Sequence, residues 1–180
     1  MVKKGDRQLS ARRVTVGCNQ KEGKTVRAAV EFQSPLGPLS LFEEAGALVS
    51  LDFGPLDRAA HKTDLLVEAS VQLQQYFAGQ RKVFTLPLRP QGTPFQKQVW
   101  QQLLLIPYGQ TLSYGRQAAA LGRPTAARAV GGANGKNPLP ILIPCHRVIA
   151  ADGSLGGYSS GLKTKEFLLS LEGCSWGPGF

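Results

Sequence analysis

The 180-residue chain lacks the apolar run that a membrane-spanning helix requires, because no stretch of about 18 consecutive apolar residues occurs in it. Its N-terminus, MVKKGDRQLSARR, is basic and also lacks the apolar segment of a secretion signal. We therefore expect a cytoplasmic protein that has no contact with a membrane.

Cysteine and histidine are scarce as well. The three cysteines, Cys18, Cys145 and Cys174, are odd in number and widely spaced, which excludes a disulfide framework and suits a reducing compartment. The two histidines, His61 and His146, leave too few closely spaced ligands for a structural zinc site. We predict no bound metal and no cofactor.

Acidic residues are few in the C-terminal half of the chain. Residues 88–180 contain nine Lys or Arg and three Asp or Glu, whereas residues 1–87 contain twelve and nine. Much of the net charge of +9 therefore belongs to the C-terminal half. Such a concentration of positive charge predicts a polyanionic partner such as nucleic acid. A basic face that serves only solubility is the alternative.

The N-terminal half is predicted to form a small antiparallel sheet with one helix. Residues 27–54 hold three short apolar stretches that the turn signals SPLG and EAG separate. Over residues 63–78 apolar side chains recur at helical spacing, and a glycine follows. Residues 1–26 are polar, basic and without periodicity, which indicates a loose basic arm.

The C-terminal half is predicted to be helical, and a proline-containing linker separates it from the first, so that we expect domains at 1–90 and 91–180. Thr93 begins a helix with a capping box, and this helix is expected to run to Pro107. Ser113 opens a second short helix, and a third follows after a Gly-containing turn. That pair indicates a helix-turn-helix. A last helix is expected over residues 162–172.

The third of these helices, TAARAVGGAN, is nearly bare of side chains. A glycine inside a helix costs about 1 kcal/mol relative to alanine. Close packing against another helix would explain the composition. Close approach to a bulky partner would explain it too, with Arg128 as the one long side chain. We favour the second interpretation, because this is the recognition position of a helix-turn-helix.

The stretch ILIPCHRVIA, residues 141–150, is an apolar, strand-like run with a polar centre. A thiolate is the reactive form of cysteine, but a free thiol with a pKa of about 8.5 is mostly protonated at neutral pH. His146 and Arg147 are two groups able to keep Cys145 ionised. Neighbouring side chains of an extended chain point to opposite faces, so that Cys145 and His146 need not touch.

These features together resemble the O6-alkylguanine-DNA alkyltransferase family, also called methylated-DNA–protein-cysteine methyltransferases. The resemblance extends from about Thr93 to Gly173, and the N-terminal half matches the family in outline. It implies an α+β fold with a ribonuclease-H-like first domain and a winged-helix-like second domain. The matching blocks are SYG at 113–115, ARAVGGANGKNP at 127–138, ILIPCHRV at 141–148, GGYSSGL at 156–162 and KEFLLSLEG at 165–173.

The resemblance implies irreversible transfer of an alkyl group from O6 of guanine, and from O4 of thymine, in double-stranded DNA to Cys145. Each molecule, expected to be a monomer, would act once. In the family a water molecule links the cysteine to the histidine and a glutamate orients the histidine, which implies a relay of Cys145, water, His146 and Glu172. Asn137 would brace the turn that joins the recognition helix to the active site.

The resemblance also implies that the damaged nucleotide is flipped out of the duplex, since the reacting atom lies inside the base stack. Arg128 would fill the space that the flipped base leaves. Tyr114 would press on the phosphate and contact the base, Tyr158 would form a wall for the guanine, and Ser159 would lie near O6. Main-chain groups of the nucleophilic cysteine and of Val148 would recognise the edge of the base.

Two departures and two alternatives accompany this interpretation. The ligands of the zinc site that some family members carry are missing, and the basic arm has no counterpart in the family. Lesion-binding relatives without activity have tryptophan at the position of Cys145, so that the cysteine indicates transfer competence. A thiol hydrolase would leave Arg128 and the bare helix unexplained. A plain helix-turn-helix regulator would leave Cys145 and His146 unexplained.

Overall fold

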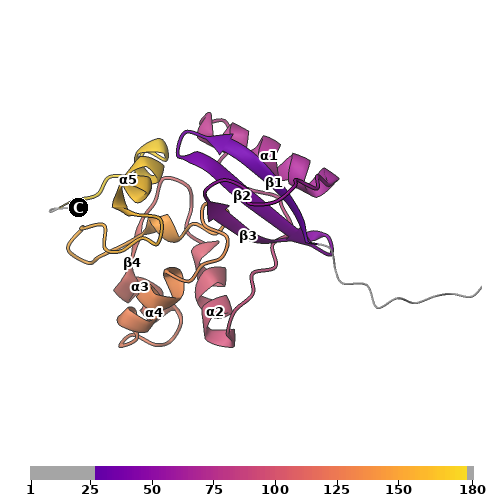
Figure 1. Cartoon of the computed structure of the whole chain (residues 1–180). Coiled ribbons are helices and arrows are strands. Elements are labelled where there is room, and N and C mark those ends of the chain that lie inside the picture. Colours follow the sequence, from indigo (N-terminus) through magenta and orange to yellow (C-terminus); the bar gives the residue numbers. More distant parts are fainter. Residues whose placement is uncertain (1–26, 178–180) are drawn as a thin grey trace, which may run out of the picture.

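A computed structural model describes residues 27–177, and its N-terminal part is a three-stranded antiparallel sheet (Figure 1). The strands are β1 (Ala28–Ser34), β2 (Gly37–Glu44) and β3 (Ala47–Phe53), paired in the order β1-β2-β3. Both predicted turns are present. The second one places Ala45 and Gly46 at φ values of 46° and 75°, as a tight two-residue hairpin turn requires. The predicted basic arm at 1–26 lies outside the described residues.

Helix α1 (Asp64–Phe77) packs against β1 and β2 (Figure 1). Thr63 caps its N-terminus by accepting a hydrogen bond from the amide of Leu66, and the chain leaves the helix through Gly79 at φ +72°. The predicted helix is confirmed. Its fully buried aromatic residue is Tyr76, whereas the neighbouring Phe77 is half-buried.

The C-terminal part is helical, with α3 and α4 side by side below α5 in the view of Figure 1. The α+β class is confirmed. A short parallel pair of strands, which we did not predict, joins the start of α3 to the segment after Cys145. The elements are α2 (Pro94–Leu103), β4 (Leu112–Ser113), α3 (Tyr114–Ala120), α4 (Ala127–Asn134), the 3-10 helix η1 (Cys145–Arg147), β5 (Val148–Ile149) and α5 (Leu162–Leu171).

The predicted capping box of α2 is present, because the side chains of Thr93 and Gln96 each accept a hydrogen bond from the other residue's main chain. The prediction that α2 runs to Pro107 was wrong, since the helix ends at Leu103. After the end of the helix the main-chain hydrogen bonds span three residues instead of four, as in the bond from Ile106 N to Leu103 O. This tighter turn buries Ile106 and leaves the two leucines before it exposed.

The strand-like prediction for residues 141–150 was wrong for most of the run, because only Val148 and Ile149 are in a strand. Residues 141–143 form a turn with Ile141 at φ 72°, and Cys145–Arg147 form η1. Pro140 and Pro144 cannot donate main-chain hydrogen bonds, so that a regular ladder cannot pass through them. The apolar side chains are buried all the same.

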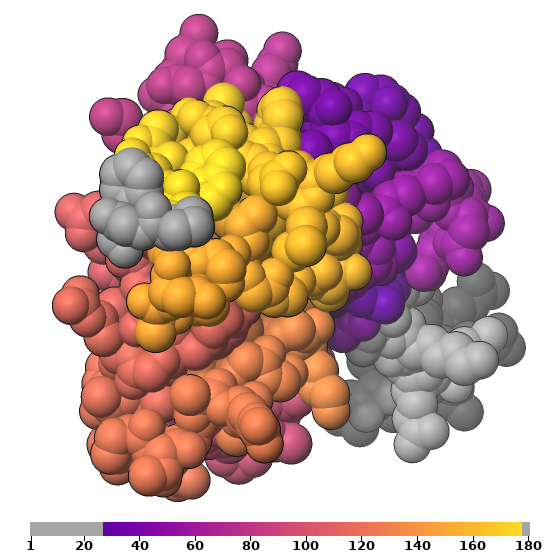
Figure 2. Space-filling model, turned by 90° about the vertical axis from the view of Figure 1, so that its left-hand side faces the viewer, coloured from indigo at the N-terminus to yellow at the C-terminus, as the bar shows by residue number. Residues whose placement is uncertain are grey.

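The two halves share one hydrophobic core, which contains Leu41 of β2, Leu73 of α1 and Trp100 of α2. The outer edge of β3 also bonds to the C-terminal half, since the amide of Leu51 donates to Pro138 O at 2.8 Å. In the space-filling view the segments around residues 130 and 155 lie on one face, beside the sheet (Figure 2). None of the helices between residues 27 and 177 is long and apolar enough to cross a bilayer.

Candidate functional site

A cavity of about 460 Å³ opens between α3, α4 and the loop that precedes α5. The structure brings five of the predicted site residues together at this cavity. The other four, Asn137, His146, Val148 and Glu172, are buried and do not line the cavity. The five residues that line the cavity are Tyr114, Arg128, Cys145, Tyr158 and Ser159.

Cys145 lies at the base of the cavity with 5% of its surface exposed. Burial raises the pKa of its thiol above the usual value, which makes the thiol the resting form. A hydrogen bond from Asn137 Nδ2, at 3.2 Å from Sγ, and the positive charge of Lys165 act in the opposite direction. The Tyr158 hydroxyl also favours the thiolate, although its geometry falls short of a full hydrogen bond.

Asn137 shapes the turn that carries the thiol. Its side-chain nitrogen donates to Ile143 O at 2.7 Å as well as to Cys145 Sγ, and its oxygen accepts from the amide of Leu139 at 3.0 Å. One side chain therefore bonds both ends of the turn that replaces the expected strand. This is the bracing position that the resemblance implies for it.

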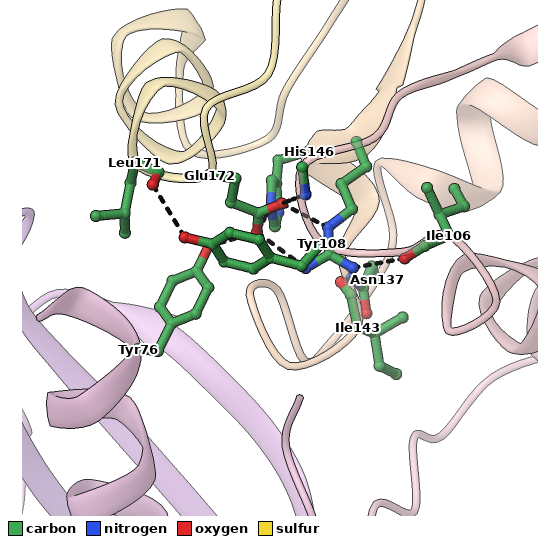
Figure 3. Close-up of polar contacts among 10 residues, drawn as sticks. Tyr76, Ile106, Tyr108, Asn137, Ile143, His146, Leu171 and Glu172 are labelled. Atoms are coloured by element: carbon green, nitrogen blue, oxygen red, sulfur yellow. Dashed lines mark hydrogen bonds and ion pairs between the residues drawn. The ribbon is translucent and has the colours of Figure 1, made fainter. Parts of the chain in front are cut away.

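Behind the thiol, His146 and Glu172 form a buried pair (Figure 3). His146 Nε2 lies 2.9 Å from Glu172 Oε1, and Nδ1 has no hydrogen-bond partner among residues 27–177. A carboxylate can only accept, so that Nε2 carries the proton and Nδ1 is free to accept one. No hydrogen bond of the described chain joins His146 directly to Cys145. The two residues lie in η1, and not in the extended chain from which we inferred that they need not touch.

Burial lowers the pKa of His146, while Glu172 acts to raise it. The imidazole is therefore neutral in the resting protein. Burial alone would raise the pKa of Glu172, but hydrogen bonds from His146 and Arg147 and the positive charge of Arg147 lower it to about 2. The carboxylate is therefore ionised at neutral pH.

Arg147 does not act on the thiol, which corrects the expectation that it keeps Cys145 ionised. Its guanidinium binds Glu172 through Nε at 2.8 Å and Nη2 at 2.9 Å, and Nη1 donates to Ile106 O at 2.6 Å. Arg147 is not part of the cavity lining, and the Glu172 carboxylate supplies the partner that a buried guanidinium requires. The cation that acts on Cys145 is Lys165 instead.

Lys165 is a functional candidate that the sequence analysis missed. It is fully buried on α5 and donates to the carbonyl oxygens of Val148 and Leu155. Burial lowers its pKa to about 8, and Cys145 acts to raise it. The signal in the sequence is a lysine on the helix face that carries Leu168 and Leu169, because a charged side chain is rarely placed on a core face without a partner.

The helix-turn-helix exposes the side of α4 that has few large side chains to solvent and to the cavity. Arg128 is exposed at the cavity rim, on the first turn of α4. The ring of Tyr114 lies between the two helices and the loop, and a Cβ atom at Gly156 would come within 3.0 Å of it. Because Gly156 also has φ +63°, no larger residue is accommodated there without strain. Tyr114 Oη donates to Gly157 O at 3.3 Å.

This arrangement can perform nucleophilic chemistry with a thiol, a neutral base and an orienting carboxylate. Between residues 27 and 177, no group of three or more His, Cys, Asp or Glu side chains is placed to hold a metal ion. Arg128 is exposed and is one of the residues that line the cavity.

Comparison with protein families identifies two regions of the chain. Residues 31–90 match the ribonuclease-like domain of 6-O-methylguanine DNA methyltransferase, and residues 94–174 match the DNA binding domain of the same family. Together the two matches include all nine predicted site residues.

Proteins similar to this chain include two methylated-DNA–protein-cysteine methyltransferases. That of Methanosarcina acetivorans is 49% identical over 149 residues, which cover 79% of this chain and 96% of the relative. The constitutive one of Bacillus subtilis is 49% identical over 156 residues, which cover 80% and 94%.

Solved structures are similar over the same region. Mycobacterium tuberculosis OGT in complex with DNA has a TM-score of 0.73 at 45% identity and covers 79% of this chain and 91% of its own. The O6-methylguanine methyltransferase of the same organism has a TM-score of 0.75 at 42% identity and covers 86% and 96%.

Proposed function

Because this chain belongs to the O6-alkylguanine-DNA alkyltransferase family, we propose that it repairs duplex DNA by irreversible transfer of an alkyl group from O6 of guanine to its own Cys145. The observation that carries the proposal is the placement of this one thiol at the base of the cavity, with a neutral histidine and an ionised glutamate behind it. O4-alkylthymine is proposed as a second substrate.

In the proposed reaction Cys145 Sγ attacks the alkyl carbon, a C–S bond forms and the C–O bond breaks. The electron pair of that bond stays on guanine O6, and the base takes up a proton from solvent, which balances the thiol proton released on the protein side. The thiol proton passes to His146 Nδ1 through a water molecule, and Glu172 stabilises the imidazolium that results. The free Nδ1 atom supports this direction of transfer. Asn137 and Lys165 favour the thiolate as it develops.

The proposed DNA contacts follow from the residues at the cavity. Arg128, at its rim, would occupy the place of the flipped nucleotide in the duplex. Tyr114 would contact the phosphate and the base, while Tyr158 and Ser159 would border the guanine. Val148 O accepts a hydrogen bond from Lys165, and its second lone pair can accept one from the base edge.

The proposed reaction places the protein with the DNA of the cell, in the cytoplasm, as a monomer that needs no cofactor. We also propose that residues 1–90 and 91–180 are its two domains. Incubation with O6-benzylguanine, followed by mass spectrometry of the intact chain, tests the activity. A stable adduct of one benzyl group supports alkyl transfer. A hydrolase would release its product, and a simple regulator would not react at all.

Arg128→Ala is expected to slow repair of O6-methylguanine in duplex DNA by roughly ten- to a hundredfold, because the flipped state loses the side chain that replaces the base. Reaction with free O6-benzylguanine should stay near the wild-type rate, since no duplex has to open. Single-turnover rates on both substrates measure the difference.

Arg123→Ala is the matched control for Arg128→Ala. Arg123 has the same charge but lies in the turn between α3 and α4, outside the cavity lining. It should change both rates little. Equal losses on both substrates for Arg128→Ala would instead assign that residue to the fold or to the chemistry.

DNA binding is expected to depend strongly on salt and weakly on sequence, because it rests on phosphate contacts and on insertion into the minor groove. Affinity for an unmodified duplex should fall at least about tenfold between roughly 50 and 200 mM salt. Titration of several unrelated duplexes measures both effects. A preference of about a thousandfold for one sequence would favour the regulator.

A further inference from the structure

One hydrogen bond joins the N-terminal half of the protein to the relay behind Cys145. Tyr76, in the last turn of α1, donates from Oη to Glu172 Oε1 at 2.7 Å, although 96 residues separate the two along the chain. Both side chains are buried, and Tyr76 is fully so. Figure 3 shows Tyr76 reaching from its helix toward the Glu172 carboxylate, which also accepts a hydrogen bond from His146.

The Glu172 carboxylate is saturated with donors. Its Oε1 atom accepts from Tyr76, from His146 Nε2 and from Arg147 Nη2, at 2.7 to 2.9 Å. Its Oε2 atom accepts from Arg147 Nε at 2.8 Å and from the amide of Gly109 at 3.3 Å. Since two carboxylate oxygens offer about four lone-pair positions, these five donors compete for them. The tyrosine and the histidine compete for the same oxygen.

We propose that Tyr76 is a positioning residue of the alkyl-transfer site, which holds Glu172 Oε1 in place and sets how strongly this atom attracts the proton of His146. The inference rests on the proposed function. A donor on Oε1 withdraws negative charge from it, so that the imidazolium is stabilised less and His146 remains a neutral base. The sheet-plus-helix half would then control the chemistry as well as complete the fold.

Tyr76 keeps its proton under all working conditions, because burial and the neighbouring Glu172 raise its pKa well above the usual range. It is therefore a donor that does not switch with pH. The other titratable or charged groups around the pair come from η1, from α5 and from the segments after α2 and α5. They are Cys145, Arg147, Lys165, Tyr108 and Cys174.

Tyr76→Phe removes the donor and preserves the ring. Single-turnover transfer from O6-benzylguanine should become about three- to tenfold slower, because the loss of the hydrogen bond that holds Glu172 Oε1 in place outweighs the stronger attraction of this atom for the imidazolium. In the pH–rate profile, the acid limb is where the rate falls as His146 becomes protonated. This limb should move to higher pH, because Oε1 then stabilises the His146 imidazolium more strongly. NMR of the imidazole nitrogens checks this independently of substrate. His61, the second histidine of the chain, serves as an internal reference.

Tyr108→Phe is the matched control. The Tyr108 ring lies 6.2 Å from that of Tyr76, but its hydroxyl donates to Leu171 O and not to the carboxylate. It should leave the acid limb and the His146 signals unchanged. If both variants shift the limb equally, or neither shifts it, the positioning role is wrong.

A difluorotyrosine at position 76 strengthens the hydrogen bond that Tyr76→Phe removes, because it is a stronger donor of nearly the same shape. The acid limb should move to lower pH. A shift in the same direction as Tyr76→Phe would contradict the proposal. Failure of the wild-type protein to react with O6-benzylguanine would overturn the proposed function, whereas the His146 titration would still decide the role of Tyr76.

Discussion

Cys145→Ala is expected to abolish alkyl transfer completely while DNA binding persists. The wild-type protein should repair at most one guanine per chain, because transfer forms a thioether, and a thioether offers water no carbonyl group to attack. His146 and Glu172 can help to form this bond, but no group at the site can cleave it. Titration with an excess of methylated duplex measures the number of guanines repaired per chain.

The modified residue is expected to be Cys145 alone, with a mass gain of about 14 Da for one methylene on its peptide. Cys174→Ala is the matched control, since Cys174 is also buried but lies outside the cavity lining. Burial raises the pKa of Cys174 to about 11, which makes it a poor nucleophile. Multiple turnovers, or a methyl group on another cysteine, would overturn the mechanism.

Glu172→Gln is expected to have the largest combined effect on stability and activity. The substitution leaves the Arg147 guanidinium buried without its carboxylate, and loss of one member of a buried ion pair costs about 3–5 kcal/mol of unfolding free energy. His146 also loses the group that stabilises its protonated form, so that transfer should slow by at least about a hundredfold. Chemical denaturation and single-turnover rates measure the two effects.

The pH dependence of stability distinguishes Glu172 from other carboxylates. Its pKa is lowered to about 2 in the folded protein, so that its contribution to stability is present above the unfolded value of about 4.3 and is lost as the pH falls toward 2. Glu172→Gln should therefore remove part of the stability loss in this window. Glu166→Gln, at an exposed position of the helix that Glu172 caps, should behave as wild type.

Local sequence accounts for most of the secondary structure. The capping box at Thr93 and Gln96 depends on residues three apart, and the glycine at 79 supplies the conformation that ends α1. The error in the run 141–150 has a local cause as well. Apolar composition indicates burial, but the same composition is compatible with a strand and with a buried turn.

The candidate site was predictable where its members lie close together in the chain. Asn137, Cys145 and His146 span ten residues, and the turn before η1 brings Asn137 into contact with Cys145. Arg147 was assigned to the thiol because it is near in sequence, whereas its partner Glu172 lies 25 residues away. Tyr76 could not be predicted because it resembles an ordinary core residue of a helix, whereas Lys165 has a signal only through its place on the apolar face of α5.

By itself the sequence determined the two-part α+β organisation, the starts of the helices, the nucleophile and the family, because these depend on local patterns and on motifs in a fixed order. Only the tertiary structure decided the partners of the buried charged and polar groups. Tyr76, His146 and Arg147 meet at one carboxylate because packing brings α1, η1 and the end of α5 together. The requirement that buried polar groups be paired then selects the contacts, and this requirement acts between residues that are distant in the chain.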